Sequence, residues 1–247
     1  EISVQKILKS STGEMKLDLK IQFEEGKLIT VYGKSGAGKS TLLMLLAGLM
    51  NPENGYISMG KDVWTDTTKH IFLPPQKRNI GFVFQEYALF PWMTVQDNIS
   101  FGLEIKGDAL KQRRDKSQSY ISRFGLEGFE DKYPKELSGG MRQRVAIART
   151  LINDPSVILM DEPFGALDAQ TRVAMHEILL RIWEAHRTTV LFVTHDVDEA
   201  LILSDRAHIM SAGPGRIIET MDVTQERPRH VDNIGPGFLT ARNHIIR

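Results

Sequence analysis

A glycine-rich loop between a predicted strand and a predicted helix constrains the fold of this chain more than any other feature. The apolar run 28–32 predicts a buried strand, and the run 41–49 predicts a helix. The residues that match the phosphate-binding pattern G-x-x-x-x-G-K-[ST] are Gly33, Gly38, Lys39 and Ser40. In that pattern backbone N–H groups surround phosphates, the lysine reaches the terminal ones and the hydroxyl binds Mg²⁺. An ordinary glycine-rich turn is the alternative, and the flanking strand and helix count against it.

Composition excludes several classes of protein. Thirty-one basic and 31 acidic side chains give a formal net charge of zero, so no overall field steers the chain towards nucleic acid. The absence of cysteine excludes disulfides and thiolate sites and suits a reducing cytoplasm. The apolar stretch 42–50 is about half as long as a membrane span, and no signal-peptide pattern opens the sequence. We therefore expect a globular protein that another subunit must hold at any membrane.

Alternating polarity at the start of the chain predicts a β-hairpin. Residues 2–8 and 15–23 alternate as strands do around a turn at 10–13, and a second turn at 24–26 precedes the phosphate-loop strand. We expect this hairpin to form an antiparallel β edge. The next predicted elements are a short strand at 56–59, a polar excursion that ends at Pro75 and a buried strand at 80–84.

The apolar period changes from two to 3.6 between residue 86 and about residue 152, which predicts a mostly helical insert. A basic run within it, 111–116, is a solvated helix face rather than a nucleic-acid patch. Beyond the insert, strands alternate with helices, as in a parallel α/β sheet. The predicted elements are helices at 95–104, 109–124, 139–152, 168–186 and 197–203, and strands at 156–160, 189–193 and 206–210. We predict one α/β domain over residues 1–220 and a short tail at 221–247.

Polar residues follow three of the predicted strands, and they are Gln85, Asp161 with Glu162, and His195. Ligands bind beyond the carboxyl ends of strands in open α/β sheets, so Asp161 and the phosphate loop can converge on one metal–phosphate site if their strands are neighbours. Glu162 is then free to polarise a water for in-line attack on a γ-phosphate. A strand-end cap for the carboxylates and a structural role for the histidine are the alternatives.

A second candidate anion site lies at residues 137–143, with the sequence Leu-Ser-Gly-Gly-Met-Arg-Gln. Ser138, Gly139 and Gly140 directly precede a predicted helix, where they form an N-cap with exposed backbone donors. A plain helix cap with flexible glycines is the alternative for this segment alone. The chain therefore carries two predicted helix N-termini of a kind that binds phosphate.

The order and spacing of these motifs resemble an ABC transporter ATPase subunit, over about residues 15–220. The resemblance rests on the loop 33–41, Gln85, the signature 137–143, the segments 157–162 and 165–168, and His195. It implies a P-loop NTPase fold of the α/β class with a mixed core sheet, an antiparallel β edge and a helical insert. It also implies a head-to-tail dimer, in which each ATP lies between the phosphate loop of one copy and the signature of the other.

The resemblance also implies roles for individual residues. The expected contacts of ATP are Gly33, Lys34, Ser35, Gly36, Ala37, Gly38, Lys39, Ser40 and Thr41 of one copy, and Ser138, Gly139, Gly140 and Gln143 of the other. The expected Mg²⁺ ligands are Ser40, Asp161 and Gln85. Glu162 is the expected general base, His195 contacts the γ-phosphate, with Gln85 assisting, and Asp168 links the two sites across the dimer. Family members commonly stack an aromatic residue of the first hairpin on adenine, whereas residues 6–20 contain none, so we expect looser base selectivity.

Several segments resemble the nitrate/sulfonate/taurine branch of ABC importers, and they are 86–95, 125–129, 161–172 and 213–217. The segment 73–81 instead resembles the molybdate-type branch, which leaves a molybdate-type importer as an alternative. The run 86–95 clusters Phe, Pro, Trp and Met, which predicts either core or a surface that receives a helix of a membrane subunit.

The resemblance implies a peripheral protein at the cytoplasmic face of the membrane, coupled to uptake of a small anion such as nitrate, sulfonate or taurine. The implied partners are two transmembrane permease subunits, a periplasmic or lipid-anchored solute-binding protein and a second copy of the chain, and nucleic acid is not among them. A soluble ABC ATPase of DNA repair or translation and an exporter ATPase are the alternatives from other classes.

Overall fold

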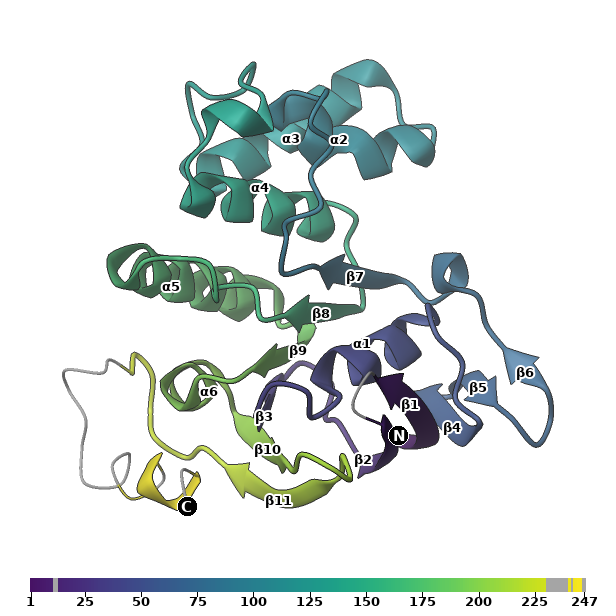
Figure 1. Ribbon diagram of the computed structural model, residues 1–247. Helices are drawn as coiled ribbons and strands as arrows, with labels where there is room; N and C mark the ends of the chain where they lie inside the picture. Colours follow the sequence, from purple (N-terminus) through teal and green to yellow (C-terminus); the bar gives the residue numbers. More distant parts are fainter. Residues whose placement is uncertain (11–12, 230–239, 241, 246–247) are drawn as a thin grey trace. The chain divides into compact units, whose positions relative to one another are not determined.

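The computed structural model describes residues 1–10, 13–229, 240 and 242–245, and the chain divides into two units (Figure 1). Unit 1 comprises Glu1–Ile80 and Arg187–Arg247, and unit 2 comprises Gly81–His186. Each unit encloses buried apolar side chains of its own, such as Leu42 in unit 1 and Phe124 in unit 2. No helix in these described ranges is long and apolar enough to cross a membrane.

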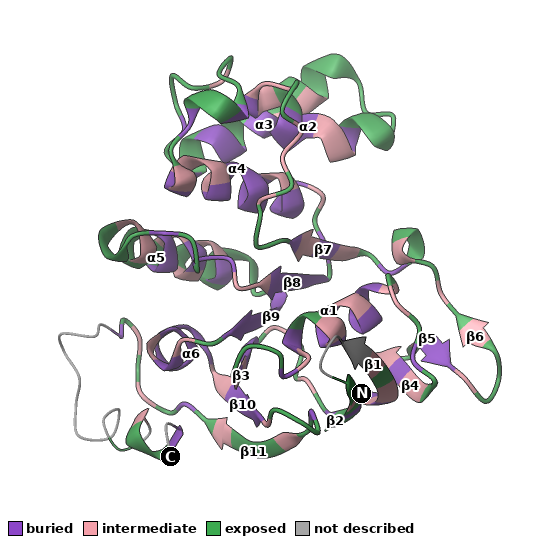
Figure 2. Ribbon diagram, viewed as in Figure 1, coloured by how far each residue is buried: buried purple, intermediate pink, exposed green. Residues whose placement is uncertain are grey.

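Four strands of unit 1 form a largely parallel array: β3 (Leu28–Gly33), β9 (Thr189–Thr194), β10 (Arg206–Met210) and β11 (Ile217–Asp222). They lie in the order β11-β10-β3-β9, with β3 parallel to both of its neighbours and β11 antiparallel to β10. Nearly every residue of β3, β9 and β10 is buried (Figure 2). Burial on both faces explains why their sequences are continuously apolar rather than alternating.

The other strands of unit 1 form an antiparallel sheet in the order β2-β1-β4-β5-β6: β1 (Ile2–Ser10), β2 (Gly13–Ile21), β4 (Asn54–Met59), β5 (Asp62–Asp66) and β6 (Ile71–Phe72). The register of β1 and β2 pairs Ile2 with Ile21 and Leu8 with Met15. On β2 every second residue from Leu17 to Ile21 is buried, as the alternating sequence predicts. The predicted antiparallel edge is confirmed, and two positions of its predicted turn, 11–12, lie outside the described residues.

A buried histidine on β10 is held in its neutral form. His208 pairs with Thr220 across β10 and β11, and its Nδ1 lies 2.8 Å from the hydroxyl of that threonine. Burial lowers the pKa of His208 to about 4, and the nearby charge of Arg206 contributes in the same direction. Protonation of this imidazole therefore opposes folding.

Helix α1 (Lys39–Ala47) follows the phosphate loop, and an arginine fixes its far end. Gly48 ends the helix at φ 73°, where a Cβ would collide with the guanidinium of Arg78. Arg78 is 2% exposed, and its Nη1 donates to the carbonyls of Leu45 and Leu46 at 2.9 and 2.7 Å. A cation at this end complements the helix dipole, although burial lowers its pKa.

Helix α6 (Val197–Leu203) is the second α-helix associated with the parallel array. Two arginines of the segment after β11 donate hydrogen bonds to carbonyl groups at its end. Arg229 is buried, and its Nη1 donates to the carbonyls of Leu201 and Ser204 at 3.0 and 2.6 Å. Arg227 donates to the carbonyl of Leu203 at 2.6 Å. The start of the predicted tail therefore packs on unit 1.

Unit 2 contains two strands and four α-helices: β7 (Ile80–Val83, which starts at the border of the units), β8 (Val157–Asp161), α2 (Val95–Ile105), α3 (Leu110–Arg123), α4 (Gly139–Leu151) and α5 (Ala169–His186). β7 and β8 are neighbours in their sheet, and their arrows run in the same direction (Figure 1). The hydroxyl of Tyr120 on α3 donates to the carbonyl of Leu151 on α4 at 3.2 Å. Two short 3₁₀ helices complete the named elements, η1 (Pro75–Lys77) in unit 1 and η2 (Pro134–Glu136) in unit 2.

The predicted helices and buried strands are confirmed to within a few residues, and two segments were predicted wrongly. The polar excursion before Pro75 contains β5 and β6, because Thr65 and Asp66 are buried in the sheet despite their polarity. Strand β11 was missed because its side chains are exposed or half-buried and show no apolar period.

Candidate functional site

The phosphate loop closes tightly around a buried lysine. Gly36 and Gly38 have φ values of 79° and 97°, which residues with a side chain rarely adopt. A Cβ on Gly33 would lie 2.9 Å from the carbonyl oxygen of Met210, so this position also excludes a side chain. Lys39 is 4% exposed, and its Nζ donates to the carbonyl of Gly33 at 2.8 Å. The loop therefore carries a positive charge within a backbone cradle.

The N-terminus of α1 completes this cradle. Gly38 is the N-cap residue, and α1 has neither a side-chain cap nor an acidic residue in its first turn. The first amides of a helix carry partial positive charge and point towards an incoming anion. The nine predicted contact residues run from the last residue of β3 to the first turn of α1. Their geometry fits phosphate groups.

The strand register brings His195 to the phosphate loop within unit 1. Tyr32, which directly precedes the loop, pairs with Thr194, and His195 is the next residue. His195 is exposed, whereas Thr194 is buried and donates to a carboxylate oxygen of Glu199 at 2.6 Å. Asp196 N-caps α6, accepting from the backbone N–H groups of residues 198 and 199. These bonds fix the backbone on both sides of His195 and leave its ring at the surface.

Gln85, Asp161 and Glu162 lie at or just beyond the ends of two neighbouring strands within unit 2. Gln85 follows β7 by two residues, Asp161 is the last residue of β8, and Glu162 comes next. Glu162 has a φ of 42°, which costs energy for a residue other than glycine. Strained backbone of this kind concentrates at functional sites.

The signature motif begins α4 with an exposed serine. Ser138 is the N-cap, and its Oγ accepts from the backbone N–H of Met141 at 3.3 Å. The two glycines differ in their surroundings. A Cβ on Gly140 would collide with the methyl group of Thr171, whereas a Cβ on Gly139 would meet nothing closer than 3.6 Å. Gly140 is thus needed for packing, and Gly139 leaves the surface beside Ser138 open.

Two other predicted residues, Gln143 and Asp168, lie in different environments. Gln143 is 0% exposed, and neither of its amide atoms has a hydrogen-bond partner among the described residues. The predicted contact of Gln143 with ATP remains a prediction. Asp168 lies just before α5 and accepts from the backbone N–H of Thr171 at 2.9 Å, and this hydrogen bond is the main reason why its pKa is lowered. Asp168 itself is exposed.

The structure thus assembles two groups of predicted residues, one in each unit. The phosphate loop and His195 belong to unit 1. Gln85, Asp161, Glu162, the signature and Asp168 belong to unit 2. No cluster of three or more metal-ligating acidic or histidine side chains occurs in the described part of the chain. The shared Mg²⁺ site of Ser40, Asp161 and Gln85 remains a prediction.

Sequence motifs missed the residues that pack against the phosphate loop from behind. A Cβ on Gly215 would lie 2.5 Å from the carbonyl oxygen of Ala37 and 2.8 Å from Leu17. A Cβ on Gly38 would lie 2.8 Å from Leu17 and 3.4 Å from Met15. The loop therefore rests on the hairpin and on the turn before β11. The two glycines and the proline of that turn, at 213–215, are its local signal in the sequence.

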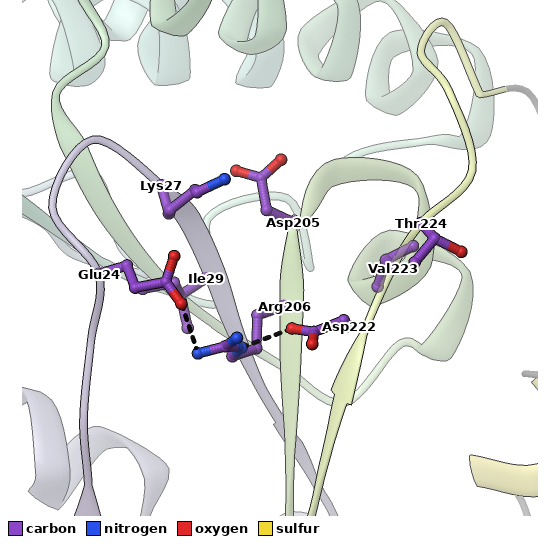
Figure 3. Close-up of a pocket in the computed structure, with 8 residues that line it drawn as sticks. All are labelled: Glu24, Lys27, Ile29, Asp205, Arg206, Asp222, Val223 and Thr224. Carbon is purple, nitrogen blue, oxygen red and sulfur yellow. Dashed lines mark hydrogen bonds and ion pairs between the residues drawn. The ribbon is translucent and has the colours of Figure 1, made fainter.

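A charged cavity of ≈ 290 Å³ lies at the amino end of β3, away from the loop (Figure 3). Its lining residues are Glu24, Lys27, Ile29, Asp205, Arg206, Asp222, Val223 and Thr224. Arg206 pairs with Asp222 at 2.6 Å and with Glu24 at 2.8 Å. Hydrogen bonding to Asp222 raises the pKa of Arg206. Because these charges neutralise one another and the loop follows the opposite end of β3, this cavity is not the candidate nucleotide site.

Comparison with known proteins gives the family. The ABC transporter family model matches residues 17–165, which is more than half of the chain. The chain belongs to the ABC transporter family. It is 48% identical over 246 residues to an aliphatic sulfonates import ATP-binding protein from Bacillus thuringiensis subsp. konkukian, covering 99% of this chain and 92% of that protein. It is 49% identical to an uncharacterized ABC transporter ATP-binding protein from Methanocaldococcus jannaschii, covering 93% of this chain and 82% of that protein.

A solved structure supports the same assignment. A dimeric ATP-binding cassette in a post-hydrolysis state, bound to ADP and Pi, aligns with a TM-score of 0.76 at 30% identity. The alignment covers 92% of this chain and 100% of that chain. The predicted ABC ATPase fold and the predicted class of enzyme, an ATPase, are confirmed.

Proposed function

We propose that this chain is the ATP-hydrolysing subunit of an ABC importer, acting as a head-to-tail homodimer on the cytoplasmic face of the membrane. The observation that carries the proposal is the register of β3 and β9, which sets His195 beside a complete phosphate cradle. We assign the ATPase function to residues 1–220 and regard 221–247 as a tail.

Within one copy, the loop amides and Lys39 bind the phosphates of ATP. Ser40, Asp161 and Gln85 offer hydroxyl, carboxylate and amide oxygens, the donor types that Mg²⁺ prefers, and they are assigned as its ligands. When bound, Mg²⁺ neutralises charge on the phosphates. Glu162 orients the attacking water and accepts its proton, and His195 donates to the γ-phosphate.

The second copy supplies Ser138, which is exposed, and Gly139, which is half-buried, and both are available to a nucleotide that arrives from outside the subunit. Asp168 links the two sites across the dimer. ATP favours the closed dimer because only that state offers both half-sites, and hydrolysis removes the γ-phosphate that joins them. Closure in turn moves the permease.

Adenine is assigned to an aliphatic surface in place of an aromatic one. Leu8 and Met15 pair across β1 and β2, so their side chains lie on the same face as Leu17. A Cβ on Gly38 would meet the side chains of Leu17 and Met15, together with that of Met210, which puts this face beside the loop. Both Leu8 and Met15 are half-buried, and they offer apolar contact without base-specific hydrogen bonds.

We assign the loop that carries Trp92 as the surface that binds the permease. This side chain is 70% exposed, which is unusual for a tryptophan that only fills a core. Asn98 shapes the loop, since its amide accepts from the backbone N–H of Phe90 at 2.9 Å and donates to the carbonyl of Met93 at 3.0 Å. A fixed, exposed aromatic residue is suited to anchor a helix of another subunit.

An aliphatic sulfonate is the proposed solute, because relatives that share nearly half of their residues with this chain are named for sulfonate import. Purification of the native complex tests the solute and the permease together. Identification of a sulfonate-binding protein and its permease in the complex supports the assignment. A molybdate-binding partner, an exporter permease or nucleic-acid-stimulated hydrolysis contradicts it.

Glu162→Gln tests the enzymatic proposal. The amide keeps the shape of the side chain and cannot accept a proton, so ATP binding should persist while hydrolysis falls by 100-fold or more, on the order of what a positioned general base supplies. ATP should then convert the variant from monomer to dimer in size-exclusion chromatography. Glu184→Gln, at an exposed position of α5, is the matched control. Normal hydrolysis by Glu162→Gln without dimerisation would refute the proposal.

A further inference from the structure

The segment after Gln85 adopts a backbone conformation that its own residues disfavour. Tyr87 and Ala88 have φ values of 61° and 47°, in the left-handed region. Neither residue is glycine, asparagine or aspartate, the types that tolerate this region best. Two successive residues in this conformation persist only where the surrounding structure holds them.

Arg149 on α4 supplies that support. Its Nη1 donates to the carbonyl of Ala88 at 2.7 Å, and its Nη2 donates to the carbonyl of Tyr87 at 3.1 Å. The guanidinium lies 5.5 Å from the ring centre of Phe90. Burial lowers the pKa of Arg149, and among the described residues the hydrogen bonds of its guanidinium are those two to backbone carbonyls. A rigid planar fork on two successive carbonyls fixes the backbone between them.

The same segment contacts the signature. The guanidinium of Arg142 lies 5.7 Å from the ring centre of Tyr87. A Cβ on Gly139 would lie 3.6 Å from the hydroxyl of Tyr87. Any relaxation of the backbone at Tyr87 would therefore displace a side chain at the start of α4 as well as the residues next to Gln85.

We propose that Arg149 is a positioning residue that holds Tyr87 and Ala88 in the left-handed conformation, and thereby sets the positions of Gln85 and of the signature for hydrolysis. The inference rests on the proposed function, which gives those two sites their roles. The proposed function assigns binding of the phosphates to the loop of unit 1, so loss of Arg149 should lower kcat and leave the KM for ATP unchanged.

Rescue by glycine distinguishes positioning from general destabilisation. Arg149→Met removes the fork and keeps an unbranched side chain, and kcat should fall about tenfold because the strained conformation loses its support. Glycine at position 88 adopts the left-handed conformation without strain. Adding Ala88→Gly to Arg149→Met should therefore raise kcat about fivefold above that of Arg149→Met alone. Arg144→Met is the matched control, since Arg144 lies on the same helix and donates to the carbonyls of residues 124 and 125, both at 3.3 Å.

Amide hydrogen exchange of the peptide 85–90 gives a readout that does not depend on hydrolysis. Exchange should become several-fold faster in Arg149→Met, return towards wild type on addition of Ala88→Gly, and stay unchanged in Arg144→Met. A wild-type kcat and exchange rate in Arg149→Met, or failure of Ala88→Gly to restore either, overturns the inference. If Glu162→Gln hydrolyses ATP normally, the proposed function fails, and the exchange measurements still decide the role of Arg149.

Discussion

Gly215→Ala tests whether the shape of the phosphate loop depends on the turn behind it. Gly215 is held on both sides by β2, because its N–H donates to the carbonyl of Lys16 and its carbonyl accepts from the N–H of Asp18, each at 2.9 Å. Its φ lies outside the left-handed region, so alanine meets no backbone strain there. The only obstacle is space: the new Cβ would lie 2.5 Å from the carbonyl oxygen of Ala37.

The size of the effect follows from that distance. Moving from 2.5 Å to the 3.4 Å of an ordinary contact requires a shift of about 0.9 Å, and two hydrogen bonds prevent Gly215 from retreating. The backbone of Ala37 must therefore move, and because Ala37 belongs to the phosphate loop, the loop changes shape. Overpacking of this kind costs about 1–3 kcal/mol, which corresponds to a roughly 5- to 150-fold rise in the Kd for ATP if the loop takes the whole strain.

Titration with a fluorescent ATP analogue measures this change, and thermal unfolding measures the accompanying loss of stability. Gly213→Ala is the matched control two residues away. Gly213 has a φ of 56° and no heavy atom within 4 Å of its Cβ position, so alanine there should cost about 1–2 kcal/mol of stability and leave ATP affinity unchanged. Wild-type affinity in Gly215→Ala, or equal weakening in Gly213→Ala, would refute the reasoning.

Trp92→Ala should weaken co-purification with the permease without lowering the melting temperature of the isolated subunit, since 70% of the side chain is already exposed. Leu8→Tyr should lower the Kd for ATP about fivefold or more by adding a ring that stacks on adenine, measured by the same titration. Unfolding by denaturant should show stability falling by up to about 3 kcal/mol between pH 6.5 and pH 4, because the pKa of His208 is lowered to about 4 in the folded state and only the unfolded state takes up the proton in that window. His208→Gln should remove that part of the pH dependence.

Much of the fold could be predicted because its central strands are encoded locally. β3, β8 and β9 are buried on both faces, so their continuous apolar runs are visible in the sequence. β11 is different, because its partner in space and not its own composition makes it a strand. The same distinction separates the phosphate loop, whose pattern is contiguous, from Gly215, which meets that loop only after the chain has folded.

Gln143 shows how a motif can obscure a signal that the sequence does contain. Gln143, Ile147 and Leu151 recur at intervals of four residues along α4, and all three are buried. That spacing is the stripe of a helix that faces a core, so the apolar period alone places the Gln143 side chain inside the unit. Proximity to the signature suggested instead a contact with ATP. Ser138 begins the helix, and Gly139 lies on its open side. Contact with a partner's nucleotide therefore requires only the first turn of α4. The residues beyond that turn are spaced so that one face of the helix packs against the core.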